Sequence, residues 1–122
     1  MSDVVRTVSN LHTIVVAAHT TTHLPPDRAV ITTPALVALM ERCIAKSEQR
    51  LERHDGRWLS IAADINHRAG LKQGEYIHLR AQRSPGMPGD REQWHVTATA
   101  DADGRLIAEG TIERAWEAVC PA

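Results

Sequence analysis

The sequence predicts an α+β domain in which an antiparallel sheet of about five strands wraps around one long helix. Two observations predict this class. An apolar stripe with helical spacing occupies residues 29–53, and period-two alternation dominates the chain after it, in segments joined by short connections. A single strand-like segment precedes the helix. Strands that follow one another without intervening helices are typical of antiparallel α+β domains.

Composition restricts the classes of protein to which the chain can belong. Its 122 residues, 43% hydrophobic and 24% charged, predict a single domain over residues 1–122. A formal net charge of -1, with only three tryptophans and one tyrosine, makes nucleic acid an unexpected partner. Cys43 and Cys120, in a chain without a signal-peptide pattern, indicate reduced thiols and a cytoplasmic protein. No apolar run approaches the roughly 20 residues of a membrane helix.

The first two elements are a strand and the long helix. Residues 11–20 are rich in β-branched side chains and predict a strand, and a Pro-Pro-Asp turn at 25–27 leads to the helix. Thr33 is expected to cap the helix, and Pro34 fits the first helical position because no N–H is needed there. The predicted buried stripe consists of Leu36, Met40, Cys43, Ile44, Ser47 and Leu51.

Glu41 lies on the flank of this stripe, beside Val37 and Ile44, so its carboxylate is expected at the edge of the buried face. Arg42, Lys46, Gln49 and Arg53 fall on the opposite, solvent-facing side. The helix is predicted to end at His54-Asp55-Gly56, with Gly56 as a left-handed cap.

The strand after the helix carries a histidine in the phase of its apolar residues. Residues 57–67 alternate, which predicts that Leu59, Ile61, Ala63 and Ile65 face inward. His67 continues this phase, so its imidazole is expected to point toward the core.

Three more strands complete the predicted sheet. Residues 75–82 alternate with Ile77, Leu79 and Ala81 inward, and a connection at 84–90 leads to a strand with Trp94, Val96, Ala98 and Ala100 inward. Asp103-Gly104 is a hairpin signal. The last strand, residues 105–119, has Leu106, Ala108, Gly110 and Ile112 in one phase.

Four motifs resemble those of hotdog-fold thioesterases of the fluoroacetyl-CoA thioesterase type. They are TTPALVALME, LSIAADINH, a Gly-containing turn and GTIER, and the resemblance covers about residues 30–119. That family has a catalytic Thr before the central helix, a Glu eight residues later and a His twenty-six residues after the Glu. Thr33, Glu41 and His67 match both spacings.

The resemblance implies a hotdog-fold homodimer that hydrolyses a small or modified acyl-CoA or acyl-carrier-protein thioester without a metal or redox cofactor. The family usually has Gly seven residues before the His, where a backbone N–H approaches the thioester carbonyl, and Ser60 occupies that position here. Val37, beside Glu41, is a further candidate contact for the substrate. Arg68 and Lys72, just after His67, are candidates for the coenzyme A phosphates.

These residue types suit thioester hydrolysis. The reaction needs a nucleophile or activated water, a donor for the oxyanion and a proton for the leaving thiolate. Glu41 can act as nucleophile or general base, Thr33 as nucleophile or as a holder of water, and His67 as donor or proton shuttle. Two alternatives keep the fold: a non-hydrolytic module that binds an acyl thioester, which Ser60 favours, and a hydratase or dehydratase.

Overall fold

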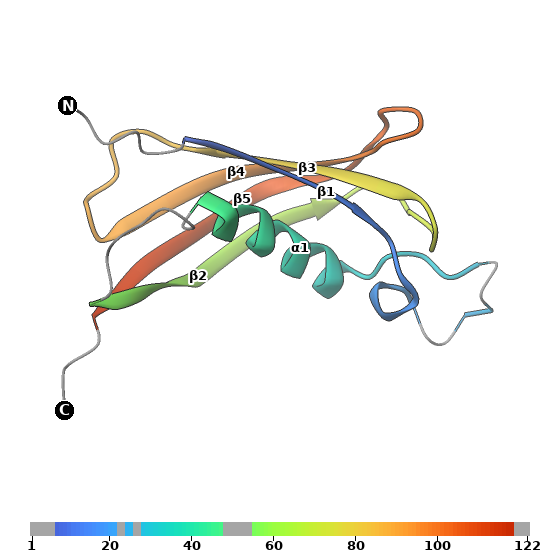
Figure 1. The fold of residues 1–122 in the computed structure, drawn as a ribbon, viewed down its shortest axis with the longest axis horizontal. Coiled ribbons are helices and arrows are strands. Elements are labelled where there is room, and N and C mark those ends of the chain that lie inside the picture. Colours follow the sequence, from blue (N-terminus) through green and yellow to red (C-terminus); the bar gives the residue numbers. More distant parts are fainter. Residues whose placement is uncertain (1–6, 22–23, 26–27, 48–54, 119–122) are drawn as a thin grey trace.

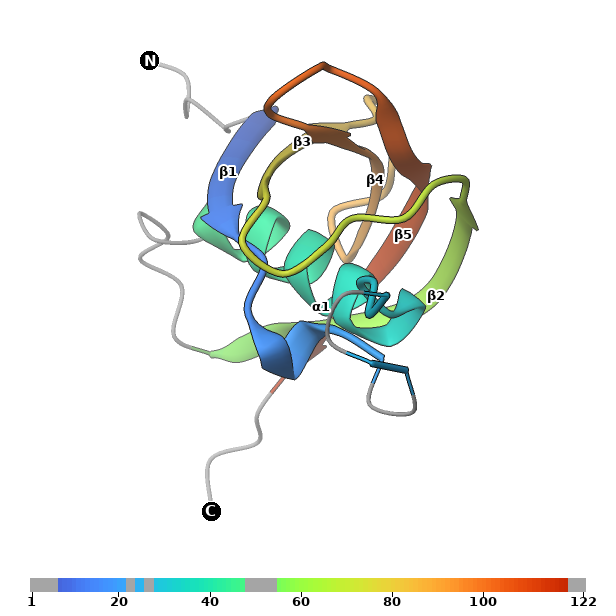
Figure 2. The same cartoon turned by 90° about the vertical axis from the view of Figure 1, so that its right-hand side faces the viewer.

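The computed structural model describes residues 7–21, 24–25, 28–47 and 55–118. The elements, in chain order, are β1 (Val8–Ile14), the 3-10 helix η1 (Ala17–His19), α1 (Thr33–Ala45), β2 (Gly56–His67), β3 (Tyr76–Arg83), β4 (Arg91–Ala100) and β5 (Leu106–Ala118). The five strands form one antiparallel sheet in the order β1-β3-β4-β5-β2. This sheet curves around α1 (Figures 1 and 2), which confirms the predicted fold class.

The hydrophobic core lies between α1 and the concave face of the sheet. The helix contributes Leu36, Leu39, Met40, Cys43 and Ile44, all buried. The inward residues of β3 and β4 are those that alternation predicted: Ile77, Leu79, Ala81, Trp94, Val96, Ala98 and Ala100. Side-chain burial therefore fixes the register of these two strands, since a slip of one residue would expose every one of these side chains.

The start of α1 differs from the prediction by one residue. Thr32 is the N-cap, and its Oγ1 accepts a hydrogen bond of 3.2 Å from Ala35 N, whereas Thr33 is the first helical residue. The helix ends at Ala45 and is continued by a 3-10 turn at 46–47; the predicted positions of Leu51, Gln49 and Arg53 lie outside the described residues. Gly56 opens β2 and does not have a positive φ, so its predicted role as a left-handed cap is wrong.

The first strand is shorter than predicted, because β1 ends at Ile14 and η1 follows at Ala17–His19. The bond from Val16 N to His19 Nδ1, 3.1 Å long, holds this tight turn. The residues that were assigned to the end of a strand therefore form a turn that leads toward the start of α1.

A bulge at Ile61 changes the phase of β2. The pairing of β2 with β5 shifts there by one residue, and Ile61 is 47% exposed. Ala63 lies opposite the buried Ile112 and so points toward α1, whereas Leu59, before the bulge, lies opposite Ala115 with the other phase. The predicted inward positions of Leu59 and Ile61 are therefore wrong. The later inward positions, Ile65 and His67, keep their predicted phase.

A second bulge lies near the start of β5, where the pairing with β4 shifts at Ile107. Leu106 lies opposite Thr99 and is half-buried, whereas Ile107 and Ala108 are both buried. Leu106 therefore does not share the inward phase predicted for it. The turn before β5 is as predicted, with Gly104 at φ 72°.

No helix among the described residues is long and apolar enough to cross a membrane.

Candidate active site

The side chains of Thr33 and His67 meet at the N-terminus of α1. Thr33 Oγ1 lies 2.9 Å from His67 Nδ1, within hydrogen-bond distance. Thr33 is the first residue of α1 and His67 is the last residue of β2, so 34 positions separate them in the sequence. The contact depends on how the fold brings the start of the helix to the end of one strand.

Backbone hydrogen bonds hold both segments in place. Just before α1, Ile31 N donates to Leu71 O over 2.8 Å, and just after His67, Arg68 N donates to Ile107 O over 2.8 Å. The helix start is thus tied to the connection that follows β2, and that connection is tied to β5. Because main-chain groups make these bonds, the relative placement of Thr33 and His67 does not depend on surface side chains.

The hydroxyl of Thr33 is available to His67 because its neighbour caps the helix. Thr32 Oγ1 accepts from Ala35 N, as caps do, and Thr33, one residue further, bonds the imidazole instead. A neutral His67 can accept the hydroxyl proton at Nδ1, or donate to the hydroxyl from Nδ1, according to its tautomer. The pair is exposed, so a substrate can reach it.

Glu41 lies further along the same helix and is half-buried, as predicted from its place on the flank. Eight residues of α-helix separate it from Thr33, which corresponds to about 12 Å along the axis. Among the described residues, no hydrogen bond joins Glu41 to Thr33 or His67. Val37, one turn before Glu41, is half-buried as well. One chain thus brings two of the three motif residues together.

The other candidate residues lie on β2 and on the connection after it. Ser60 is exposed, precedes the bulge and lies opposite Arg114 of β5. Arg68 Nη2 donates to Glu109 Oε1 over 3.1 Å. Lys72 is exposed, and its ammonium makes no ion pair within the described parts of the chain. Of the two cations, Lys72 is the one with an uncompensated charge.

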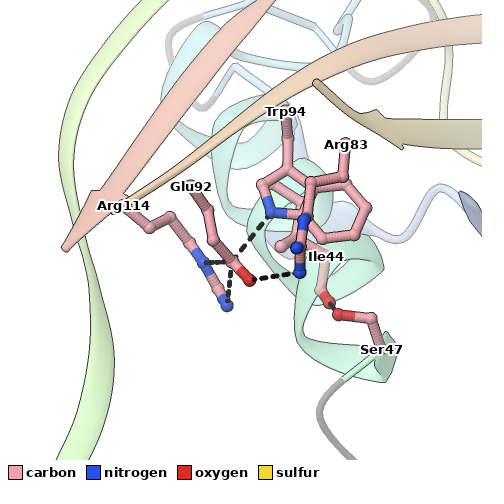
Figure 3. Close-up of polar contacts among 6 residues, drawn as sticks. All are labelled: Ile44, Ser47, Arg83, Glu92, Trp94 and Arg114. Atoms are coloured by element: carbon pink, nitrogen blue, oxygen red, sulfur yellow. Dashed lines mark hydrogen bonds and ion pairs between the residues drawn. The ribbon is translucent and has the colours of Figure 1, made fainter. Parts of the chain in front are cut away.

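A buried charge network was not predicted from the sequence. Glu92 Oε1 accepts from Arg114 Nη2 (2.8 Å) and Nε (3.1 Å) and from Trp94 Nε1 (2.9 Å), and Glu92 Oε2 accepts from Arg83 Nη1 (3.3 Å). Figure 3 shows these groups gathered beside Ile44 of α1. The side chains of Glu92 and Arg114 are only 8% and 6% exposed. The sequence did contain one signal for this network. Glu92 lies two residues before Trp94, so its side chain points to the same, buried face of β4.

Arg114 also lies over an aromatic ring, with its Cζ 5.4 Å from the centroid of Trp58. The positive charge is therefore balanced by Glu92 and contacts the face of Trp58, an arrangement that favours a cation. We interpret this network as structural, because one buried carboxylate bonds two guanidinium groups and an indole N–H and thereby ties β3, β4 and β5 together.

Other reactive groups are less well placed for chemistry. Cys43 is buried and free, and burial raises the pKa of its thiol, which keeps the thiol protonated and a poor nucleophile. Within the described ranges, no three His, Cys, Asp or Glu side chains are grouped so that they could hold a metal ion.

An antiparallel sheet wrapped around one central helix is the hotdog fold, and solved structures with this fold match the chain closely. No protein-family model and no curated protein matches the sequence. A variant of the fluoroacetyl-CoA-specific thioesterase FlK is similar at 25% identity with a TM-score of 0.80, over 96% of this chain and 91% of that one.

Two further similar structures are more distant in sequence. A thioesterase superfamily member from Thermus thermophilus has 20% identity and a TM-score of 0.77, over 91% of this chain and 81% of the other. A hypothetical thioesterase from Streptococcus pneumoniae, solved with coenzyme A, has 12% identity and a TM-score of 0.72, over 93% and 81%. The fold is therefore shared across sequences that have diverged widely.

Proposed function

We propose that this chain is an acyl thioesterase that hydrolyses a small or modified acyl-CoA or acyl-carrier-protein thioester. The observation that carries the proposal is the Thr33–His67 hydrogen bond at the start of α1. The names of the similar structures support it, since one is a fluoroacetyl-CoA-specific thioesterase and another was solved with coenzyme A. The helix N-terminus adds a positive potential that stabilises a developing oxyanion.

The proposed chemistry follows from the two bonded groups. In a covalent route His67 takes the Thr33 hydroxyl proton at Nδ1, Thr33 Oγ1 attacks the thioester carbonyl, and His67 returns the proton to the leaving thiolate; water then hydrolyses the acyl ester. Glu41 can take the place of Thr33 as nucleophile, and water then hydrolyses the anhydride that forms. In the water route Thr33 Oγ1 holds the water, Glu41 takes its proton as general base, and His67 passes a proton to the thiolate. In each route the C–S bond breaks and one water is consumed to give a carboxylic acid and a thiol. No metal or redox cofactor takes part.

We infer that the working unit is a homodimer joined through β2. This strand lies at an edge of the sheet, and five consecutive residues, 60–64, are exposed in the isolated chain. They include Ile61, an exposed large apolar side chain. A free edge with apolar side chains invites pairing with a second strand, and a two-fold axis lets the same edge serve both chains.

Such a dimer would complete the site with Glu41 from the second chain. Within one chain, α1 begins beside His67 at the end of β2. Antiparallel pairing of two β2 strands reverses the direction of the partner, which brings the later half of the partner's helix toward the start of α1. The partner subunit's Glu41 can then approach Thr33 and His67, which the 12 Å spacing of about two helical turns prevents within one chain.

We assign the remaining candidate residues to substrate binding. Val37 lines the acyl group, the backbone N–H of Ser60 donates to the carbonyl oxygen, and Arg68 and Lys72 lie near the phosphates of the carrier. Ser60 in place of glycine is also the feature that favours the alternative, a module that binds an acyl thioester without hydrolysing it.

Purified protein mixed with a panel of acyl-CoAs and a thiol-trapping dye tests the proposal. Thiol release that disappears in Thr33→Ala supports hydrolysis at this site. Binding of the acyl-CoA without thiol release indicates a non-hydrolytic module, and a change in acyl unsaturation without thiol release indicates a hydratase. Either of these last two outcomes rejects the thioesterase assignment.

A further inference from the structure

The turn between β1 and the helix contains a histidine whose ring accepts a main-chain hydrogen bond. Val16 N donates to His19 Nδ1 over 3.1 Å, so Nδ1 carries no proton and the neutral ring holds its hydrogen on Nε2. Val16 is the N-cap of η1 and His19 is its third residue. The imidazole therefore does what the third side chain does in a capping box, which is to accept from the N–H of the cap residue.

The other bonds of this turn do not replace the imidazole. His19 N donates to Val16 O over 2.9 Å, and Thr20 N donates to Ala17 O over 3.0 Å. Thr20 is buried, and its Oγ1 donates to Ala17 O as well, over 2.8 Å. All three bonds use carbonyl acceptors. Among the described residues, His19 is thus the only acceptor for the N–H of Val16.

The turn is bonded to the residue that precedes Thr33. Thr32 N donates to His19 O over 2.9 Å, and Thr21 N donates to Val30 O over 2.9 Å, so the turn lies beside the segment that enters α1 (Figure 1). Thr32 is the N-cap of α1, and Thr33 follows it. The backbone that carries the Thr33 hydroxyl is therefore one residue from a bond to the turn. On this side the helix start depends on a half-buried side chain, the imidazole of His19, rather than on a surface one.

Protonation of His19 would remove the acceptor that closes the turn. A doubly protonated imidazole donates from both nitrogens, so the N–H of Val16 would face another donor. The turn would then no longer hold the carbonyl of His19 against Thr32 N. Loss of one such hydrogen bond shifts an equilibrium by about fivefold.

The neighbouring elements offer no anion that would compensate this charge. The segment that the turn contacts, residues 29–32, has no charged side chain. The connection after β2 pairs with that segment at Val30 and Lys72, and it contributes Lys72 and Glu75. The carboxylate of Glu75 is engaged, since Oε2 accepts from Lys72 N over 2.7 Å and Oε1 lies 3.6 Å from Arg105 Nη2.

We propose that His19 is a positioning residue for the Thr33–His67 pair and that it acts only while its Nδ1 is unprotonated. The inference rests on the proposed thioesterase function and extends it to a side chain outside the candidate site. His19 does not touch the substrate. It holds the backbone of Thr32, and with it the hydroxyl of Thr33, in the place where that hydroxyl meets the ring of His67. Turnover therefore falls on the acid side for a reason that is separate from protonation of His67.

Asparagine at this position separates the two properties of the ring. Its Oδ1 is as many bonds from Cα as Nδ1 is, so it can accept from Val16 N, but it takes up no proton between pH 5 and 8. At pH 8, His19→Asn should keep kcat within about twofold of the parent, whereas His19→Ala should lower kcat about fivefold with KM nearly unchanged. His95→Asn is the matched control, because His95 is exposed on β4, and it should behave like the parent.

The pH profile tests the role of the proton. The ratio of kcat in His19→Asn to kcat in the parent should rise from about one at pH 8 to about five at pH 5. Protonation of His67 affects both proteins equally and cancels in this ratio. A ratio that stays at one over the whole range would overturn the inference, and so would a parental kcat in His19→Ala.

Amide NMR separates failure of this inference from failure of the proposed function, because it needs no substrate. The chemical shift of the Thr32 amide should change with pH more in the parent than in His19→Asn, and the difference between the two proteins reports on His19 alone. Such a difference supports the inference even if no thioester is hydrolysed. If the parent hydrolyses acyl-CoA but the Thr32 amide responds to pH equally in both proteins, His19 does not position the pair and the thioesterase assignment stands.

Discussion

Thr33 Oγ1 lies 2.9 Å from His67 Nδ1, a contact between the first residue of the helix and the last residue of an edge strand. The residue before it, Thr32, caps the same helix. Two adjacent threonines therefore have different roles: one satisfies a backbone N–H of the helix, and the other presents its hydroxyl to an imidazole. This division makes function and stability separable by mutation.

Thr33→Ala should lower turnover of an acyl-CoA by about 10²- to 10⁴-fold, the range expected when a group that takes part in proton transfer is lost. The free energy of unfolding should change little, because Thr33 is exposed and does not cap the helix. Thiol release measures the first quantity and urea denaturation the second.

Thr32→Ala is the matched control, and its effect should be the reverse. Loss of the cap should cost about 0.5–2 kcal/mol of stability while turnover at low temperature stays close to that of the parent. If Thr32→Ala abolished turnover and Thr33→Ala did not, the roles assigned to the two hydroxyls would be exchanged.

Mixing two inactive variants should restore activity if Glu41 and His67 of one site come from different chains. Glu41→Gln and His67→Ala are each expected to be inactive as pure dimers. Random exchange makes half of the dimers mixed, and each mixed dimer has one intact site of two, so about a quarter of the parental turnover should return. A mixture that stays inactive after exchange, verified by mass spectrometry of the dimers, would place both groups in one chain.

Ile61→Arg should prevent dimer formation and with it most of the turnover. The substitution puts a charge at the exposed bulge of β2, where strand pairing would bury it in the dimer but not in the monomer. Sedimentation reports the mass. His95→Arg, on an exposed position of the central strand β4, should leave the mass unchanged. An Ile61→Arg monomer with full specific activity would contradict the dimeric site.

Glu92→Ala should destabilise the fold by about 3–5 kcal/mol, because it removes the buried carboxylate that accepts both hydrogen bonds from the Arg114 guanidinium. Glu117→Ala removes the anion of the exposed Arg57–Glu117 pair and should cost no more than about 1 kcal/mol. Equal denaturation midpoints for the two variants would show that the buried network contributes no more than a surface ion pair.

Local pattern alone placed Leu36, Met40, Cys43 and Ile44 on the buried face of α1, although it missed Leu39, and it determined the phases of β3 and β4. Buried side chains on a regular strand alternate, and those on a helix recur every three or four residues. The burial of Trp94, Val96 and Met40 could therefore be predicted without knowing which elements pack against them. The motifs that contain Thr33, Glu41 and His67 were equally visible in the sequence, and their resemblance to hotdog-fold thioesterases implied the hotdog fold.

Only the tertiary structure decided the irregular positions. The bulges at Ile61 and Ile107 depend on how two strands pair, and one extra residue reverses the phase of everything before it, so alternation read along one strand misplaced Leu59 and Leu106. Likewise, Thr32 and Thr33 have equal intrinsic ability to cap a helix. The tertiary structure determines which of them caps the helix and which bonds His67. The backbone just before α1 is hydrogen-bonded to the connection after β2, and this places the Thr33 hydroxyl beside His67.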